Sequence, residues 1–243
     1  MIVITGPGRS GTSFLAMLYR ELGFDPGGRW NPRVRAGLEA RFPTFNRKLA
    51  AALGTSPGRR RGPRSLRWLE RRLPDSRGIR VKAGLTRLRY CRNTPDLMDW
   101  SGLDAVVTEF GETLRTLAAE TQVAKDPRFC WTLQAWLASG ASISAVVLAL
   151  RPLDAMVESR VRAGMIPDIA RAWAKNNYAY GIGLALAAAV EHRVPIEVLR
   201  FPDFLDHPRD LYERLPLPEK RTWEEFHAAF VKLHDPSLVH DRR

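Results

Sequence analysis

The sequence predicts a three-layer α/β fold in which helices cover both faces of a central, mostly parallel sheet. Short β-branched runs alternate along the chain with stretches of helical spacing, a pattern typical of parallel sheets. A glycine-rich turn joins the first of these runs to the first helical stretch. The 243 residues are 45% hydrophobic and 26% charged, which suits a large globular domain. We therefore expect a single domain over residues 1–243.

A strand, a turn and a helix are predicted within the first 23 residues. Residues 1–5 form a short β-branched run that stops at Gly6, Pro7 and Gly8, as a buried parallel strand does where it enters a tight loop. The apolar residues that follow share one helical face, and Gly23 is placed to end that helix. These apolar residues are Phe14, Leu15, Leu18 and Leu22.

The segment between residues 24 and 102 is richer in Gly, Pro and Arg. A loop over 24–41 is followed by apolar spacing that predicts a helix over 42–53. Glycine and proline, which interrupt regular structure, are frequent over residues 54–64, and a short basic helix is expected over 65–73. We therefore interpret residues 54–78 as a mobile basic insertion at the surface. A short strand is possible at 79–82.

The second half of the chain alternates more regularly between helices and strands. The clearest buried strand is Ile143–Leu150, which ends on Arg151 and Pro152. The other strands are expected over 122–125 and 195–201. Helices are expected over 103–120, 129–137, 152–163, 168–191, 208–215 and 223–233.

The composition of the chain indicates what kind of partner it binds and where the protein is found. Lys and Arg outnumber Asp and Glu by 38 to 26, and the net charge of +12 points to anionic ligands or surfaces. Two cysteines are too few for a disulfide framework, and no apolar run reaches the roughly 18 residues of a membrane span. The start of the chain lacks a signal-peptide pattern, and the histidines lack metal-ligand spacing. We expect a cytoplasmic protein without a structural metal.

The turn after the first strand carries the strongest chemical signal. Gly6–Ser13 fits the phosphate-binding pattern G-x-x-x-x-G, except that Thr12 stands where that pattern has lysine. Successive backbone N–H groups and the following helix N-terminus still form an anion cradle, and Arg9 adds a permanent positive charge. The loop predicts a P-loop-type fold. Without the lysine, however, transfer of the ATP γ-phosphate loses a principal clamp.

Two separated motifs resemble those of sulfotransferases that use 3′-phosphoadenosine 5′-phosphosulfate (PAPS). Arg-Ser-Gly-Thr-Ser at residues 9–13 looks like the family's 5′-phosphosulfate loop. In that family a strand ends in an arginine, and a serine eight residues later helps to bind the donor's 3′-phosphate. Arg151 and Ser159 have this spacing here. A guanidinium fork and a hydroxyl suit a dianionic phosphate.

A third stretch extends the resemblance. Lys125-Asp126-Pro127-Arg128 is similar to the Lys-x-Pro-Arg element of bacterial and carbohydrate-acting sulfotransferases. The resemblance implies that Lys125 and Arg128 lie near the transferring group. It also suggests Glu39, in Gly37-Leu38-Glu39, as the first candidate for the general base. Asp126 is the second candidate, although it can equally pair with Arg128.

The resemblance therefore implies an enzyme that moves a sulfuryl group from PAPS to a hydroxyl or amine of a small-molecule or glycan acceptor. The nucleotide product is adenosine 3′,5′-bisphosphate (PAP), and no metal is required. The catalytic candidates are Arg9, Glu39, Lys125 and Asp126. The donor-binding candidates are Gly8, Arg9, Ser10, Gly11, Thr12, Ser13, Arg151 and Ser159.

Two other functions remain open at this point. A nucleotide or small-metabolite kinase fits the glycine frame but is opposed by Thr12 and by the lack of a clear Asp-ending apolar strand for Mg²⁺. A non-catalytic nucleic-acid binder would use the net charge, but aromatic-basic RNA motifs and helix-turn-helix signals are missing. We expect neither a nucleic-acid partner nor a membrane span, and no motif identifies the acceptor.

Overall fold

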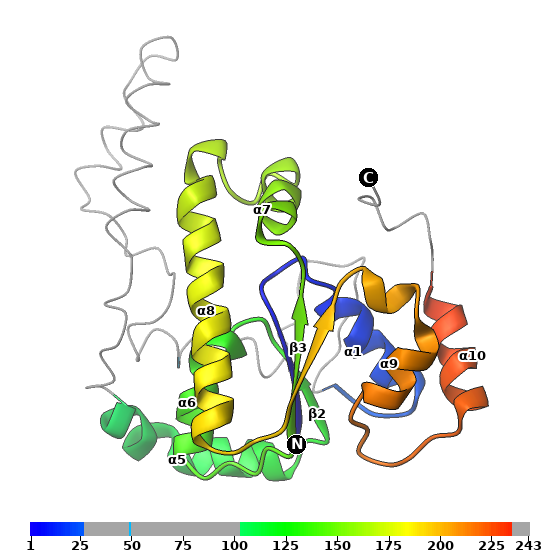
Figure 1. Cartoon of the computed structure of the whole chain (residues 1–243). Coiled ribbons are helices and arrows are strands. Elements are labelled where there is room, and N and C mark those ends of the chain that lie inside the picture. Colours follow the sequence, from blue (N-terminus) through cyan, green and yellow to red (C-terminus); the bar gives the residue numbers. More distant parts are fainter. Residues whose placement is uncertain (27–48, 50–102, 235–243) are drawn as a thin grey trace.

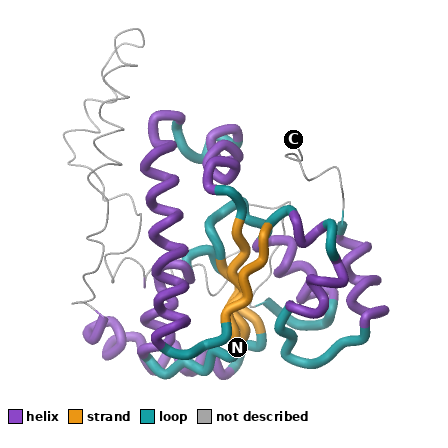
Figure 2. The backbone as a smooth tube through the Cα atoms, viewed as in Figure 1, coloured by secondary structure: helices purple, strands orange, loops and turns teal. Residues whose placement is uncertain are grey.

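The fold is built around a parallel sheet. The computed structural model describes residues 1–26, 49 and 103–234. Within them, four strands form one wholly parallel sheet in the order β2-β1-β3-β4. Figure 2 shows the strands at the centre of the fold, with helices around them. The strands are β1 (Ile2–Thr5), β2 (Val123–Lys125), β3 (Ala145–Leu150) and β4 (Ile196–Arg200). The register pairs Val3 with both Ala124 and Val146, which makes β1 a central strand.

Helices pack on both faces of this sheet, as the sequence predicts (Figure 1). One face is covered by α1, α9 and α10, whose apolar residues share a core with β1 and β3. The other face is covered by α5, α6 and α8. The helices are α1 (Thr12–Glu21), α5 (Leu103–Ala119), α6 (Phe129–Ala138), α7 (Leu153–Arg162), α8 (Arg171–Glu191), α9 (Pro208–Arg214) and α10 (Trp223–Leu233).

Two predicted elements begin two or three residues before the observed ones. The helix expected over 168–191 begins as a 3₁₀ turn, Asp168–Ala170, and becomes α8 at Arg171. The Ala170 N–H donates to the Pro167 carbonyl at 2.9 Å, an i→i+3 bond that tightens this end. The strand expected from Ile143 starts at Ala145. Three predicted elements lie outside the described residues: the helix over 42–53, the basic insertion over 54–78 and the strand at 79–82. Of the helix, only Leu49 is described, and it is helical and buried.

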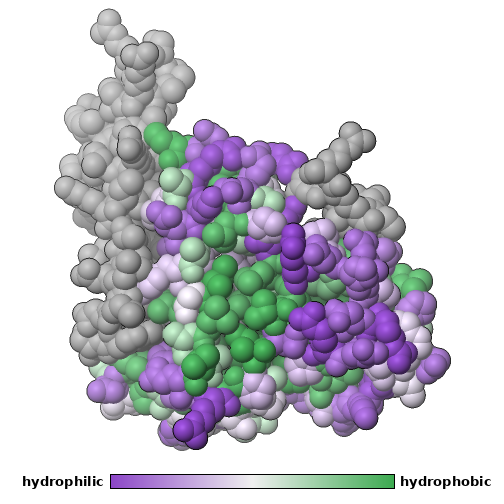
Figure 3. Space-filling view, in the orientation of Figure 1, coloured by the Kyte–Doolittle hydropathy of each residue, from purple (hydrophilic) through white to green (hydrophobic). Residues whose placement is uncertain are grey.

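How far a strand is buried depends on its place in the sheet. All four residues of β1 are buried because both faces of the sheet are covered there. β4 lies at an edge and exposes 38% of Val198, and Figure 3 shows hydrophobic residues gathered beside it, between α8 and α9. Across the described parts of the chain, every helix is too short or too polar to span a bilayer.

Candidate functional site

The predicted site residues that the structure describes lie at or near the carboxyl ends of β1, β2 and β3. From β1 the chain continues to β2 on one side of the sheet, and it returns to build β3 and β4 on the other side. The strand order therefore reverses between β1 and β3. Ligands of open α/β sheets bind in the crevice beside such a switch point. The glycine loop follows β1 and Arg151 follows β3, so both lie beside this switch point.

Two glycines allow the loop to lie against its neighbours. Gly6 has a φ of +147°, and a Cβ placed on it would lie 2.2 Å from the Ala149 carbonyl oxygen of β3. Gly11 has a φ of +85° and would place its Cβ 2.5 Å from the Phe201 ring. Gly11 is also the N-cap of α1, where no side chain caps the helix. The first N–H groups of α1 thus remain available to an anion.

Arg9 joins the first two sequence motifs directly. Its Nε donates a hydrogen bond to Ser159 Oγ at 3.0 Å, across 150 positions of sequence. Ser159 is 8% exposed and belongs to α7, whereas Arg9 is exposed. Arg9 has a φ of +78°, a conformation that costs a non-glycine residue about 1–2 kcal/mol. Such strain clusters at ligand-binding loops, because packing there imposes the conformation.

Ser10 and Thr12 supply buried hydroxyls within the loop and at the start of α1. Ser10 is fully buried, and its Oγ has no hydrogen-bond partner in the structure. That Oγ lies 2.7 Å from the position a Cβ on Gly6 would take, so the hydroxyl points into the loop. A buried hydroxyl without a partner costs about 1–3 kcal/mol. A bound anion would remove that cost by accepting from it.

Arg151 stands beside the same loop. Its guanidinium carbon lies 5.6 Å from the centroid of the Phe201 ring, and that ring packs on Gly11. The arginine is half-buried at the carboxyl end of β3. Phe201 therefore connects Arg151 to the start of α1, and the two predicted phosphate-binding motifs share one edge of the sheet.

Asp126 forms the turn after β2. Its side chain is fully buried, and its Oδ1 accepts from the Arg128 backbone N–H at 3.0 Å and from Arg128 Nη1 at 3.3 Å. Its own N–H donates to the Ile4 carbonyl at 3.2 Å. The pairing with Arg128 that the sequence left open is therefore present. These contacts favour a structural role at the turn, and a role as general base stays a prediction.

The end of β2 is held to the end of β1. Thr5 Oγ1 donates to the Asp126 carbonyl at 3.1 Å, and the Cys130 thiol lies 3.3 Å from the same hydroxyl. Burial raises the pKa of Cys130 to about 11, so the thiol stays protonated. Lys125 is half-buried, and burial lowers the pKa of its ammonium group below the usual value. A bound anion would oppose this lowering by stabilising the charged form.

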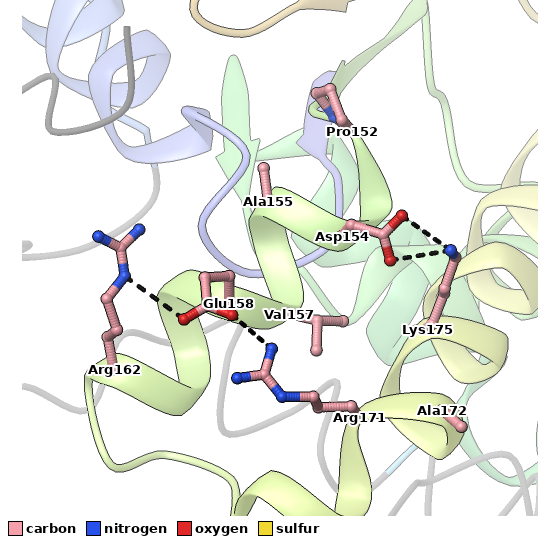
Figure 4. A pocket seen from close by; sticks show the side chains of 9 residues that line it. All are labelled: Pro152, Asp154, Ala155, Val157, Glu158, Arg162, Arg171, Ala172 and Lys175. Carbon is pink, nitrogen blue, oxygen red and sulfur yellow. Dashed lines mark hydrogen bonds and ion pairs between the residues drawn. The ribbon is translucent and has the colours of Figure 1, made fainter. Parts of the chain in front are cut away.

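A cavity of about 650 Å³ lies between α7 and α8 (Figure 4). Its charged side chains pair with one another: Lys175 with Asp154 at 2.8 Å, and Glu158 with both Arg171 and Arg162. No residue of the glycine loop lines it. The lining residues are Pro152, Asp154, Ala155, Val157, Glu158, Arg162, Arg171, Ala172 and Lys175.

The structure also adds residues that the sequence patterns did not indicate. Arg160 approaches the loop at Gly8, and Tyr178 of α8 packs beneath it. Neither belongs to a local motif, because their significance depends on how α7 and α8 pack. Glu39 lies outside the described residues. Among the described residues, no group of His, Cys, Asp or Glu is arranged to hold a metal ion.

No family model, curated protein or solved structure matches the chain. The interpretation of the site therefore depends on the residues and their geometry.

Proposed function

We propose that the chain is a sulfotransferase that takes its sulfuryl group from PAPS. The hydrogen bond between Arg9 and Ser159 is the observation that carries this proposal. It joins the loop expected to bind the donor's 5′ side to the serine expected at its 3′-phosphate. One nucleotide can therefore reach both motifs, as this function requires.

The orientation of bound PAPS follows from the positions of the protein groups that donate hydrogen bonds. The N-terminus of α1, the Ser10 hydroxyl and the Arg9 guanidinium would surround the 5′-phosphosulfate. Arg151 and Ser159 would bind the 3′-phosphate, with Ser159 exchanging its contact with Arg9 for a phosphate oxygen. This assignment uses every donor-binding motif of the sequence at one edge of the sheet.

The reaction is an in-line displacement at sulfur. An acceptor oxygen or nitrogen forms the new bond to sulfur as the bond from sulfur to the 5′-phosphate oxygen breaks. Arg9, the N–H groups of the loop and Lys125 would stabilise the charge that develops on the departing phosphate. The acceptor's proton passes to a carboxylate base, with Glu39 first and Asp126 second. The acceptor is a small molecule or a glycan, as the resemblance implies, and no motif identifies it further.

One observation favours the kinase alternative. Asp126 directly follows β2, the neighbour of β1, so an Asp-ending strand does stand beside the glycine loop. Kinases and other P-loop enzymes hold Mg²⁺ with an aspartate at such a strand end. Here the Asp126 carboxylate is paired with Arg128, and Thr12 occupies the lysine position. The sulfotransferase therefore remains the better-supported function.

Calorimetric titration separates these functions. We expect PAP to bind in the presence of EDTA, and Mg-ATP and an oligonucleotide to bind more weakly. Tight Mg-dependent ATP binding without PAP binding would favour the kinase. Strong oligonucleotide binding with a steep salt dependence would favour the nucleic-acid binder.

An arginine substitution tests the orientation of the nucleotide. Arg151→Ala should weaken PAP binding by about 1.5–3 kcal/mol, or roughly 10- to 150-fold in Kd, and should barely change the affinity for adenosine 5′-monophosphate. Arg200→Ala is the matched control, because Arg200 is an exposed arginine at the end of β4 that pairs with Asp203. Equal losses for both nucleotides in Arg151→Ala would contradict the orientation.

A further inference from the structure

We propose that Arg160 is a further anion-binding residue of the glycine loop, positioned there by Tyr178. Its ligand is the dianionic phosphate-type group that the loop holds. This proposal rests on the proposed function in one respect: if the protein binds PAPS, the anionic group at the loop is the 5′-phosphate end of that nucleotide. None of the sequence motifs includes either residue.

The guanidinium of Arg160 lies directly against the loop backbone. A Cβ built on Gly8 would come within 3.2 Å of Arg160 Nη1. Gly8 has no side chain to separate the guanidinium from the loop. Arg160 belongs to α7 and immediately follows Ser159, the partner of Arg9. Residues 159 and 160 therefore bring a hydroxyl and a guanidinium to the loop from one turn of helix.

The charge of Arg160 has no carboxylate partner in the described parts of the chain, and its Nε is buried without a hydrogen bond. Among the described residues, Arg9 likewise contacts a hydroxyl and not a carboxylate. The neighbouring cations behave differently, because Arg162 and Arg171 both pair with Glu158. Removing a guanidinium from water is unfavourable unless an opposite charge or hydrogen-bond acceptor compensates it. Two guanidinium groups at a glycine loop, neither with a carboxylate partner among the described residues and one with a buried, unpartnered Nε, point to an anionic ligand.

Tyr178 explains why Arg160 faces the loop. The guanidinium carbon lies 5.5 Å from the centroid of the Tyr178 ring, and Tyr178 is 5% exposed on α8. An aromatic face attracts a cation and restricts its rotamers. Burial raises the pKa of the Tyr178 hydroxyl, and the nearby Arg160 opposes that rise. The phenol therefore stays neutral and accepts a hydrogen bond from the guanidinium, which leaves the other N–H groups of Arg160 for an anion.

Three adenine nucleotides test this assignment by titration: PAP, adenosine 5′-monophosphate and adenosine 3′-monophosphate. Arg160→Gln should weaken binding of the two nucleotides that carry a 5′-phosphate by about 10- to 100-fold, the effect of losing a charge-assisted hydrogen bond. Binding of the 3′-monophosphate should change little. Arg151→Ala should show the opposite selectivity, with no loss for the 5′-monophosphate.

Arg162→Gln is the matched control. It removes the same charge from the same helix, but Arg162 is exposed and pairs with Glu158. Similar losses in Arg162→Gln and Arg160→Gln would show a general effect of charge and would overturn the proposal. Unchanged 5′-phosphate affinity in Arg160→Gln would also overturn it. If that variant does not fold, Arg160→Met decides, because it keeps an unbranched side chain and removes the charge, and an unchanged affinity for 5′-phosphates would refute the assignment.

The role of Tyr178 has its own readout. Tyr178→Phe keeps the ring and loses only the hydrogen bond to Arg160, so it should retain most of the affinity. Tyr178→Leu should lose affinity for 5′-phosphates only. A loss for the 3′-monophosphate as well would indicate a structural role and overturn the positioning role.

The proposal is tested even if the proposed function fails. If wild type does not bind PAP, inorganic pyrophosphate serves as the probe, and Arg160→Gln should weaken its binding. If wild type binds neither the nucleotides nor pyrophosphate, the loop is not an anion site, and the assignment of Arg160 is then wrong as well.

Discussion

Replacement of Gly6 by alanine should destabilise the protein because the loop lies against the end of β3. The new Cβ would lie 2.2 Å from the Ala149 carbonyl oxygen and 2.7 Å from Ser10 Oγ. A backbone carbonyl in the sheet moves only if the sheet moves, so a rotamer change in Ser10 relieves only the smaller overlap. The glycine φ of +147° is also unfavourable for alanine.

These effects give an order of magnitude for the loss. Backbone strain costs about 1–3 kcal/mol, and the overlap about 1–3 kcal/mol. Reduced freedom of the unfolded chain returns about 0.5–1 kcal/mol. The net loss is therefore about 1–5.5 kcal/mol, a large share of a typical stability of about 5–15 kcal/mol. For a chain of this size the melting temperature should fall by about 2–22 °C.

Thermal unfolding followed by far-ultraviolet circular dichroism measures this change, with Gly183→Ala as the control. Gly183 lies inside α8, and a Cβ there would contact nothing within 4 Å. Its replacement should stabilise the helix by about 0.5–1 kcal/mol. If Gly6→Ala melts together with wild type, the close approach of the loop to β3 is wrong. If both variants lose stability equally, the loss does not report on the loop.

The remaining predictions concern three side chains near the proposed reaction. Glu39→Gln should lower turnover by about 10²-fold or more at unchanged PAP affinity, measured by initial rates and titration, and an active variant would remove Glu39 from the mechanism. Lys125 should take up a proton when PAP binds at a pH between its lowered pKa and 10.5, seen as a buffer-dependent heat of binding that Lys125→Met abolishes; equal heats in wild type would contradict this. In the same pH window the unfolded state binds more protons at Lys125, so this residue makes stability rise with pH. In a Cys91→Ser variant, Cys130 should resist iodoacetamide at about pH 8 until the protein unfolds, because burial raises its pKa to about 11; mass spectrometry of the native protein checks this, and rapid alkylation would contradict the burial.

Local sequence signals predicted most of the described fold. Residues 1–5 and 145–150 are β-branched, apolar and bounded by breakers, so their strand character is visible without tertiary contacts. The apolar spacing in 103–120 likewise predicted α5 within one residue at its end. The start of α8 was placed too early, because the 3₁₀ turn at 168–170 has the same spacing of residues as a helical first turn.

The candidate site was predictable only in part. Gly6–Ser13 was proposed from its glycine pattern, and Arg151 and Ser159 from the resemblance to sulfotransferases. The role of Asp126 was ambiguous in the sequence, because a carboxylate two residues before an arginine can form a turn or act as a base; the structure shows the turn. Arg160 gave no local signal, since any surface arginine on a helix would look the same.

The order of strands and helices, the glycine loop and its positive charge are properties of the sequence alone, because each depends on residues that are neighbours along the chain. The tertiary structure decided which of those residues meet. Placing β1 between β2 and β3 brings Arg9 to Ser159 across 150 positions and directs Arg160 toward Gly8. Such contacts depend on the order of strands in the sheet and on the packing of α7 against α8, which local spacing does not encode.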